Sequence, residues 1–369
     1  MRAEILQKVL GVFGLLPEQG AEGARKATAR HEARVFSWGV GDEHVAGLVR
    51  VWFLTLLSGQ LMNTQNVSPV CPHPWEKEVR FFEYTAAANP RLAPVPIEVF
   101  PAREHQSGPT RIIPFDLSAT MGCAFPATTP SLMASYLRIQ REETLRTGAT
   151  CTSQMFYVIR GRGRTVGQSG HVEWSEGDLF VIPMGEALEH SALADSAIYW
   201  VHDEPLLRYL GVLPAEPRFR PTLFTRERLM RELEDVRNQP GAAQRNRMGI
   251  LLGNTATPQT LTLTHILWSL LNVLPAGVIQ KPHRHNSVAV DLCVAAAPGT
   301  YTLIGSKLDE KGNILDPVKA DWVPGSVFVT PPGLWHSHHN DTGTDAMVLP
   351  IQDAGLHTYL RTLDIQFVK

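Results

Sequence analysis

The sequence predicts a mainly β protein that contains two copies of one folding unit. Short apolar runs bounded by glycine and proline are typical of strands joined by turns, and the chain carries 29 glycines and 27 prolines. The pattern G-x5-P-x-G occurs at residues 177–185 and again at residues 325–333, and an internal repeat of this kind indicates a duplicated unit. With 369 residues, the chain is long enough for about two domains.

Composition excludes several classes of protein. Apolar residues make up 44% and charged residues 19% of the chain, which is typical of a globular protein and not of a disordered one. The net charge is −2 and the sequence has no basic stripe, so a nucleic-acid partner is not expected. The apolar run 48–57 is interrupted by Arg50 and is too short to span a bilayer, so no membrane partner is expected. Four scattered cysteines without a CxxC pair indicate a reduced, cytoplasmic chain: Cys71, Cys123, Cys151 and Cys293.

Three histidines in the last quarter of the chain are predicted to face one point. Residues 287–294 form an apolar run typical of a strand, and His283 and His285 lead into it with the same side-chain parity. Residues 326–330 form a second short strand, and the turn predicted directly after it brings His336 over the same face. Three neutral imidazoles that leave coordination positions open suit a first-row divalent metal.

The segments around these histidines resemble the two motifs of the cupin superfamily, G-x5-H-x-H and G-x5-P-x-G-x2-H-x3-N. Residues 277–285 match every fixed position of the first motif, and residues 325–340 match every fixed position of the second. The glutamate ligand of typical cupins would fall near Ala289, where the chain has no carboxylate. The resemblance therefore implies a metal site of three histidines, without a carboxylate ligand.

The first copy of the repeat is expected to lack these ligands. In its first motif, which begins at Gly148, Gln154 and Phe156 are predicted to occupy the two histidine positions, and Leu188 occupies the third. His190 lies two residues later, out of register with the motif. We therefore expect this copy to have a structural role.

Two such copies imply a bicupin, that is, two double-stranded β-helix (jelly-roll) barrels with a few flanking helices. Thr225 is suited to cap a helix that runs to about Val236. The expected division of the chain is an N-terminal extension that is partly helical (1–75), an N-terminal cupin without metal ligands (76–212), a linker with one helix (213–258) and a C-terminal cupin with the metal site (259–369).

Within the cupins, residues 335–342 (WHSHHNDT) resemble the gentisate and salicylate 1,2-dioxygenases. In that family a further histidine follows the third ligand by two residues, lies in the pocket and takes part in catalysis, and here it is His338. The resemblance implies one Fe(II) per chain, with another divalent metal as the alternative. It also implies a non-haem, extradiol-type dioxygenase that cleaves a hydroxylated or amino-substituted aromatic ring with O2, in a homo-oligomer that is a dimer or a tetramer.

Two departures from that family concern the site. Its familiar members hold the metal in the first cupin, whereas the intact motifs here lie in the second. They also carry an arginine for the substrate carboxylate where this chain has Asp291, and a carboxylate there favours a substrate hydroxyl or amino group. A buried aspartate that only satisfies a backbone or tyrosine donor is the structural alternative. We expect four residues to bind the substrate: Asp291, Trp335, Gln280 and Asn340.

Two other functions stay open from the sequence. One is a different metal-dependent cupin enzyme, such as a diketone dioxygenase, a decarboxylase or an isomerase. The other is a non-catalytic cupin that binds a small molecule. A 2-oxoglutarate oxygenase is disfavoured, because it would place a carboxylate where the chain has His285.

Overall fold

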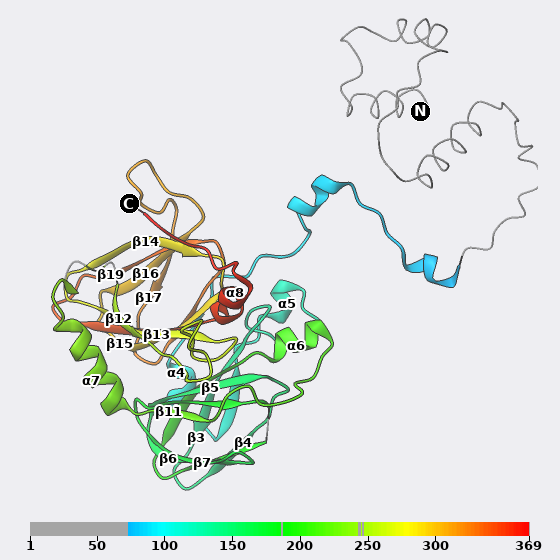
Figure 1. Cartoon of the computed structure of the whole chain (residues 1–369). Helices are drawn as coiled ribbons and strands as arrows, with labels where there is room; N and C mark the ends of the chain where they lie inside the picture. The colour runs from blue at the N-terminus through cyan, green and yellow to red at the C-terminus, as the bar shows by residue number, and fades with distance from the viewer. Residues whose placement is uncertain (1–72, 186, 243–244, 246, 369) are drawn as a thin grey trace, which may run out of the picture. The chain divides into compact units, whose positions relative to one another are not determined.

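The structure of the chain is a computed structural model that describes residues 73–185, 187–242, 245 and 247–368 (Figure 1). The chain divides into two compact units, residues 1–83 and residues 84–369. The first unit contributes the 3-10 helix η2 (Pro74–Glu78) to the described part, and the fold below is that of the second unit. The helices predicted within residues 1–72 lie outside the described residues.

The second unit is built mainly from four antiparallel sheets, which confirms the predicted mainly β class. We call two of these sheets inner and two outer, after the layers described next. The first inner sheet has the order β11 (Thr222–Phe224), β8 (Leu179–Pro183), β5 (Ser153–Arg160), β10 (Ser196–His202), β3 (Met133–Ile139) and β2 (Arg111–Pro114). The second inner sheet has the order β1 (Val99–Phe100), β18 (Val327–Thr330), β15 (Ala289–Ala295), β20 (Ala346–Gln352), β13 (Trp268–Leu274) and β12 (Met248–Leu251).

The two outer sheets are smaller. The first has the order β4 (Thr144–Thr147), β9 (Leu188–Ala192), β6 (Arg162–Gly167) and β7 (Gly170–Ser175). The second has the order β17 (Val318–Asp321), β16 (Thr300–Gly305), β19 (Trp335–Asn340), β14 (Ile279–His285) and β21 (Ile365–Phe367). Figure 1 shows β14, β16 and β19 on one side of β13 and β15, and β6 and β7 beyond β3 and β5.

The central strands of the inner sheets are buried on both faces. On β3, Tyr136 packs in the core between the two inner sheets, whereas Leu137 packs in the core between the first inner and first outer sheets. On β15, Val290 packs between the inner sheets, whereas Cys293 packs between the second inner and second outer sheets. Because neighbouring residues of a strand point to opposite faces, a strand covered on both sides needs a continuous apolar run. We call each pair of one inner and one outer sheet a barrel.

The two barrels repeat one pattern of strand pairing. The nine strands β2–β10 pair among themselves as β12–β20 do: for example, β5 lies between β8 and β10 as β15 lies between β18 and β20. Each inner sheet gains one further edge strand, β11 beside β8 and β1 beside β18. Strand β1 precedes the first barrel in the sequence but pairs in the second, so hydrogen bonds as well as the apolar core join the two barrels.

The pairing corrects one prediction about the first barrel. Gln154 and Phe156 were expected in the histidine positions, but they lie on β5, which corresponds to β15. The strand that corresponds to β14 is β4, where Thr147 stands opposite Leu188 as His283 stands opposite His336. The prediction was wrong because β4 ends at Thr147, before Gly148, whereas β14 follows Gly277. Counting residues from Gly148 therefore leads to the next strand, β5.

The second unit also contains helices: η3 (Tyr84–Ala88), α4 (Arg103–Gln106), α5 (Ser118–Met121), α6 (Glu204–Leu210), α7 (Arg226–Arg237) and α8 (Ala354–Leu360). The predicted cap of α7 is confirmed, because the Thr225 hydroxyl accepts a hydrogen bond from the Arg228 amide at 3.3 Å. Helices α6 and α8 follow the corresponding strands β10 and β20, so the duplication includes them. Among the described residues, none of the helices is long and apolar enough to cross a membrane.

The motif glycine Gly325 lies where the two barrels meet. Its φ of +83° belongs to the left-handed region that favours glycine, and a Cβ built on it would meet the Nε2 atom of His105 at 2.9 Å. The Gly325 carbonyl accepts a hydrogen bond of 2.8 Å from the Tyr136 hydroxyl of the first barrel. The turn that precedes β18, and with it the strand leading toward His336, is therefore tied to the first barrel.

Candidate metal centre

Three histidines gather on the inner face of the second outer sheet. His283 and His285 are on β14 and His336 is on β19, and each offers a ligand atom within 4.8 Å of the others. His283 stands directly opposite His336 in the antiparallel register, with ring centroids 3.9 Å apart. The alternation of β14 places His285 on the same face two residues on, with its ring centroid 4.9 Å from that of His336. We call these three residues the histidine cluster.

Two members of the cluster have the tautomer that a metal needs. His285 donates from Nδ1 to the Ser287 carbonyl at 2.8 Å, so its Nε2 atom carries the lone pair. That Nε2 atom is buried and has no hydrogen-bond partner. His336 donates from Nδ1 to the Leu334 carbonyl at 3.2 Å. A buried imidazole nitrogen without a partner costs free energy unless a ligand binds it, and this orphaned atom fits a divalent metal.

Burial also keeps the histidine cluster neutral. It lowers the pKa of His283, His285 and His336 below the ordinary value, and the positive charge of Arg247 lowers it further. Imidazoles must be deprotonated to bind a metal, so the low pKa values favour binding at pH 7.

Arg247 contacts His283, the remaining histidine of the cluster. Its Nη2 atom is 2.6 Å from the Nδ1 atom of His283, and burial lowers its pKa only to about 10, so it is charged at pH 7. A guanidinium only donates hydrogen bonds, so Nδ1 of His283 is the acceptor in this contact. If a metal binds Nε2 of His283, Nδ1 carries the proton and cannot accept a hydrogen bond from Arg247. If a metal binds Nδ1, the lone pair of that atom is no longer available to Arg247. Metal binding by His283 and the contact with Arg247 therefore exclude each other.

The histidine cluster opens into a cavity of about 300 Å³ between the two sheets of the second barrel. Its polar lining comes from the cluster, His338, Arg247, Asn272, Asp291 and Gln352. Its apolar lining includes Leu251, Trp268, Leu270, Val348, Pro350, Ile365 and Phe367. We call this cavity the histidine pocket. Its volume suits one small aromatic ring with its substituents.

Asp291 is a buried carboxyl group in the histidine pocket. It stands on β15 between residues that face the inter-sheet core, so its own side chain faces the barrel interior. The Thr330 hydroxyl donates to its Oδ2 atom at 2.7 Å. Burial raises the pKa of Asp291 to about 7, although the hydrogen bond from Thr330 acts in the opposite direction. The donor is thus a threonine, and not the backbone or tyrosine group of the structural alternative.

His338 contacts a buried threonine of the second outer sheet, which in turn contacts a buried tryptophan. Its Nδ1 atom lies 2.8 Å from the Thr302 hydroxyl oxygen, and that oxygen accepts a hydrogen bond of 2.8 Å from the Trp322 indole. The same arrangement occurs in the first barrel, where His190, Thr165 and Trp174 make the corresponding contacts at 2.8 and 2.9 Å. The arrangement thus belongs to the duplicated barrel, whereas only the copy with His338 opens into the histidine pocket.

The other three residues predicted to bind the substrate have different surroundings. Gln280 stands opposite His338, but its amide is bonded to Asn272 and to the Val273 carbonyl. The Asn340 amide donates to three carbonyls, those of Leu274 at the end of β13, of Pro275 and of Thr344, the last at 2.8 Å. Trp335 has the opposite parity to His336 and packs under the Arg284 guanidinium, 4.9 Å from the ring centroid. None of the three lines the histidine pocket, and a substrate-binding role for them stays a prediction.

Besides Asn272, two polar residues of the histidine pocket were not predicted from the sequence. Arg247 precedes β12 in a glycine- and arginine-rich segment that was expected to be part of the linker, and it reaches the pocket because β12 pairs with β13. Gln352 ends β20, opposite both Ala289 and Trp268. Neither residue belongs to a motif, so only the strand pairing identifies them.

Comparison with solved structures shows the fold of the chain. The salicylate 1,2-dioxygenase of Pseudaminobacter salicylatoxidans superimposes with a TM-score of 0.55 at 14% identity, over 89% of this chain and 99% of that one. The gentisate adduct of that enzyme gives a TM-score of 0.58 at 15% identity, over 91% and 98% of the two chains. The chain has the bicupin fold of that enzyme. In this bicupin, the histidine cluster lies in the second barrel.

Sequence comparison adds one curated relative of the bicupin. A 5-aminosalicylate 1,2-dioxygenase of Comamonas sp is 30% identical over 86 residues, which are 23% of this chain and 23% of that protein. The match thus spans about a quarter of the relative's length. No family model matches the chain.

Proposed function

We propose that the chain is an Fe(II)-dependent dioxygenase that cleaves the ring of a hydroxylated or amino-substituted aromatic acid with O2. The observation that carries the proposal is the histidine cluster, with the buried, unpartnered Nε2 atom of His285, in a pocket of about 300 Å³ that also holds a cation and a carboxyl group. Three protein ligands would leave coordination positions of the metal open for substrate and O2, as oxygenase chemistry requires. The bicupin fold and the short match to an aromatic dioxygenase support the same reaction class.

Two charged side chains support an aromatic acid as the substrate. The guanidinium of Arg247 binds carboxylates well, and its contact with His283 is lost when that histidine binds a metal. Arg247 thus supplies the carboxylate-binding cation that the sequence did not identify. Asp291, with its pKa near 7, accepts a hydrogen bond from a hydroxyl or amino substituent of the ring. A 5-aminosalicylate carries a carboxylate, a hydroxyl and an amino group, and so offers a partner to each residue.

His283, His285 and His336 would hold the iron, which would bring the oxygen substituents of the ring together with O2 and allow electrons to pass from the ring to O2. Both oxygen atoms enter the product and the ring supplies the electrons, so no external reductant is needed. His338 is positioned by Thr302, and it takes and returns the proton of a substrate hydroxyl at its Nε2 atom. The apolar lining limits the water that competes for the open positions. The first barrel has a structural role in this proposal, and the chain acts as a homo-oligomer, a dimer or a tetramer.

An oxygen electrode tests the proposal. Protein loaded anaerobically with Fe(II) is mixed with 5-aminosalicylate, gentisate or salicylate, and oxygen consumption is measured together with the loss of the aromatic absorbance. We expect about one O2 per ring cleaved, and no consumption by a His336→Ala variant prepared in the same way. Metal binding without oxygen uptake on any hydroxylated aromatic acid would instead indicate another metal-dependent cupin enzyme. Absence of metal binding would indicate a small-molecule-binding cupin.

A further inference from the structure

Gln352 is a buried residue at the edge of the histidine pocket. It stands at the end of β20, directly opposite Ala289 on β15 and Trp268 on β13. Residues directly opposite in antiparallel strands point to the same face of the sheet, and Gln352 lines the pocket together with Trp268 and Asp291. Because Ala289 has a small apolar side chain, Gln352 supplies the polar group in this part of the pocket wall.

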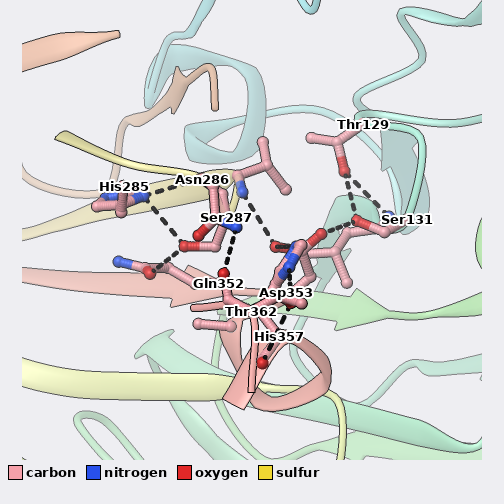
Figure 2. Close-up of polar contacts among 12 residues, drawn as sticks. Thr129, Ser131, His285, Asn286, Ser287, Gln352, Asp353, His357 and Thr362 are labelled. Carbon is pink, nitrogen blue, oxygen red and sulfur yellow. Dashed lines mark hydrogen bonds and ion pairs between the residues drawn. The ribbon is translucent and has the colours of Figure 1, made fainter. Parts of the chain in front are cut away.

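A chain of hydrogen bonds connects Gln352 to the histidine cluster (Figure 2). The Ser287 hydroxyl donates to the Oε1 atom of Gln352 at 2.8 Å, so its oxygen is left to accept. That oxygen lies 3.0 Å from Nδ1 of His285, which also donates to the Ser287 carbonyl. By orienting the hydroxyl, Gln352 supports the tautomer of His285 in which Nε2 carries the lone pair. In Figure 2 the His285 ring and the Gln352 amide extend to the same side of Ser287.

The residue that follows Gln352 is anchored on the other side of the sheet. The Asp353 carboxylate accepts hydrogen bonds from the Ser131 hydroxyl of the first barrel at 2.7 Å and from the Val288 amide at 3.0 Å (Figure 2). These bonds link the end of β20 both to the first barrel and to the segment between His285 and β15. The hydrogen bonds of the Asp353 side chain thus help to set the position of Gln352 relative to His285, in addition to the contact that the Gln352 side chain makes itself.

We infer that Gln352 belongs to the metal centre as a neutral positioning residue, which holds His285 through Ser287 and whose amide faces the histidine pocket. The inference rests on the proposed metal site. The residue's position opposite Ala289 places an amide where a carboxylate would add a fourth protein ligand and a negative charge. A neutral group keeps the full charge of a divalent metal for an anionic aromatic substrate, which must bind to the positions left open.

Metal affinity tests this role without any measurement of turnover. Competition with a chelator for Co(II) is measured for the full-length chain and its variants, together with the visible Co(II) spectrum. In Gln352→Glu, one carboxylate oxygen can accept from Ser287 and the other can bind the metal. We expect about tenfold tighter Co(II) binding or more and an altered Co(II) spectrum. In Gln352→Leu, which cannot orient Ser287, we expect Co(II) binding that is weaker by about 10–100-fold.

Gln154→Glu is the control, because Gln154 is also a buried glutamine but lies in the first barrel, on the strand that corresponds to β15. This variant should bind Co(II) as the wild type does, with the wild-type spectrum. A rise in melting temperature on Co(II) addition that is larger in Gln352→Glu than in the wild type gives a second measure where the buried carboxylate weakens the metal-free fold. Wild-type affinity and spectrum in both Gln352 variants would overturn the inference. A wild-type chain that binds no metal would overturn the proposed function instead.

Discussion

Replacement of Asp291 by asparagine removes one buried ionisable group and changes little else. The two side chains have nearly the same shape, and an asparagine oxygen can still accept the hydrogen bond from Thr330. Burial raises the pKa of Asp291 to about 7 in the folded chain, whereas an unfolded aspartate has a pKa of about 3.9. The folded state therefore binds this proton more tightly than the unfolded state does.

The direction of the pH effect follows from that difference. Asp291 destabilises the fold only when it is ionised. Its contribution to the free energy of unfolding is therefore fully present below about pH 4 and is lost as the pH rises to about 7. Three pKa units correspond to about 4 kcal/mol in total, of which about 2.5 kcal/mol is lost between pH 5 and pH 8. Asparagine does not ionise, so the variant does not lose this part of its free energy of unfolding as the pH rises. Its free energy of unfolding, relative to the wild type, should therefore rise by about 2.5 kcal/mol from pH 5 to pH 8.

Denaturant unfolding of both proteins at pH 5 and pH 8, in the presence of a chelator, measures this difference. Asp235→Asn, on the exposed face of α7, is the matched control and should unfold in parallel with the wild type at both pH values. Parallel pH profiles for Asp291→Asn and the wild type would refute a raised pKa at this position. Because Asp291 also accepts a substrate donor in the proposed function, we expect the same variant to raise KM by about tenfold or more.

Three further predictions concern the histidine pocket. Metal analysis should give about one metal per chain, and the double change His283→Ala/His285→Ala should remove it; two metals, or one that survives the change, would contradict the site. His338→Ala should retain the metal and lower kcat by about 10²–10⁴-fold, whereas loss of iron would make His338 a ligand. Arg247→Met should raise KM for a ring carboxylate by about 10–100-fold and leave an analogue without that carboxylate unaffected; an equal effect on both would remove Arg247 from substrate recognition.

Much of the histidine pocket follows from residue order along single strands. His283 and His285 share a face because side chains alternate on β14, and the G-x5-P-x-G turn places His336 opposite His283. The same alternation puts Asp291 inside the barrel and His338 on the face of the cluster. These features depend on neighbours within a few residues, so a motif records them.

Other parts of the site depend on which strands pair. Arg247 is 36 residues from His283 in the chain, and it reaches that imidazole because β12 joins the edge of the second inner sheet. The same limit explains the incorrect placement of Gln154 and Phe156, since the register of β4 and β5 is set by β9 and β10 and not by the distance from a glycine.

The sequence alone determined the mainly β class, the duplication, the three histidines and the parity of Asp291 and His338, because each is a local pattern of spacing and alternation. The tertiary structure alone decided that Arg247 touches His283, that Gln352 is linked to His285 through Ser287, and that Gln280 and Asn340 are engaged in other hydrogen bonds. It decided them because these contacts form between strands brought together by long-range pairing and by a core shared between two barrels, and neither leaves a fixed spacing in the sequence.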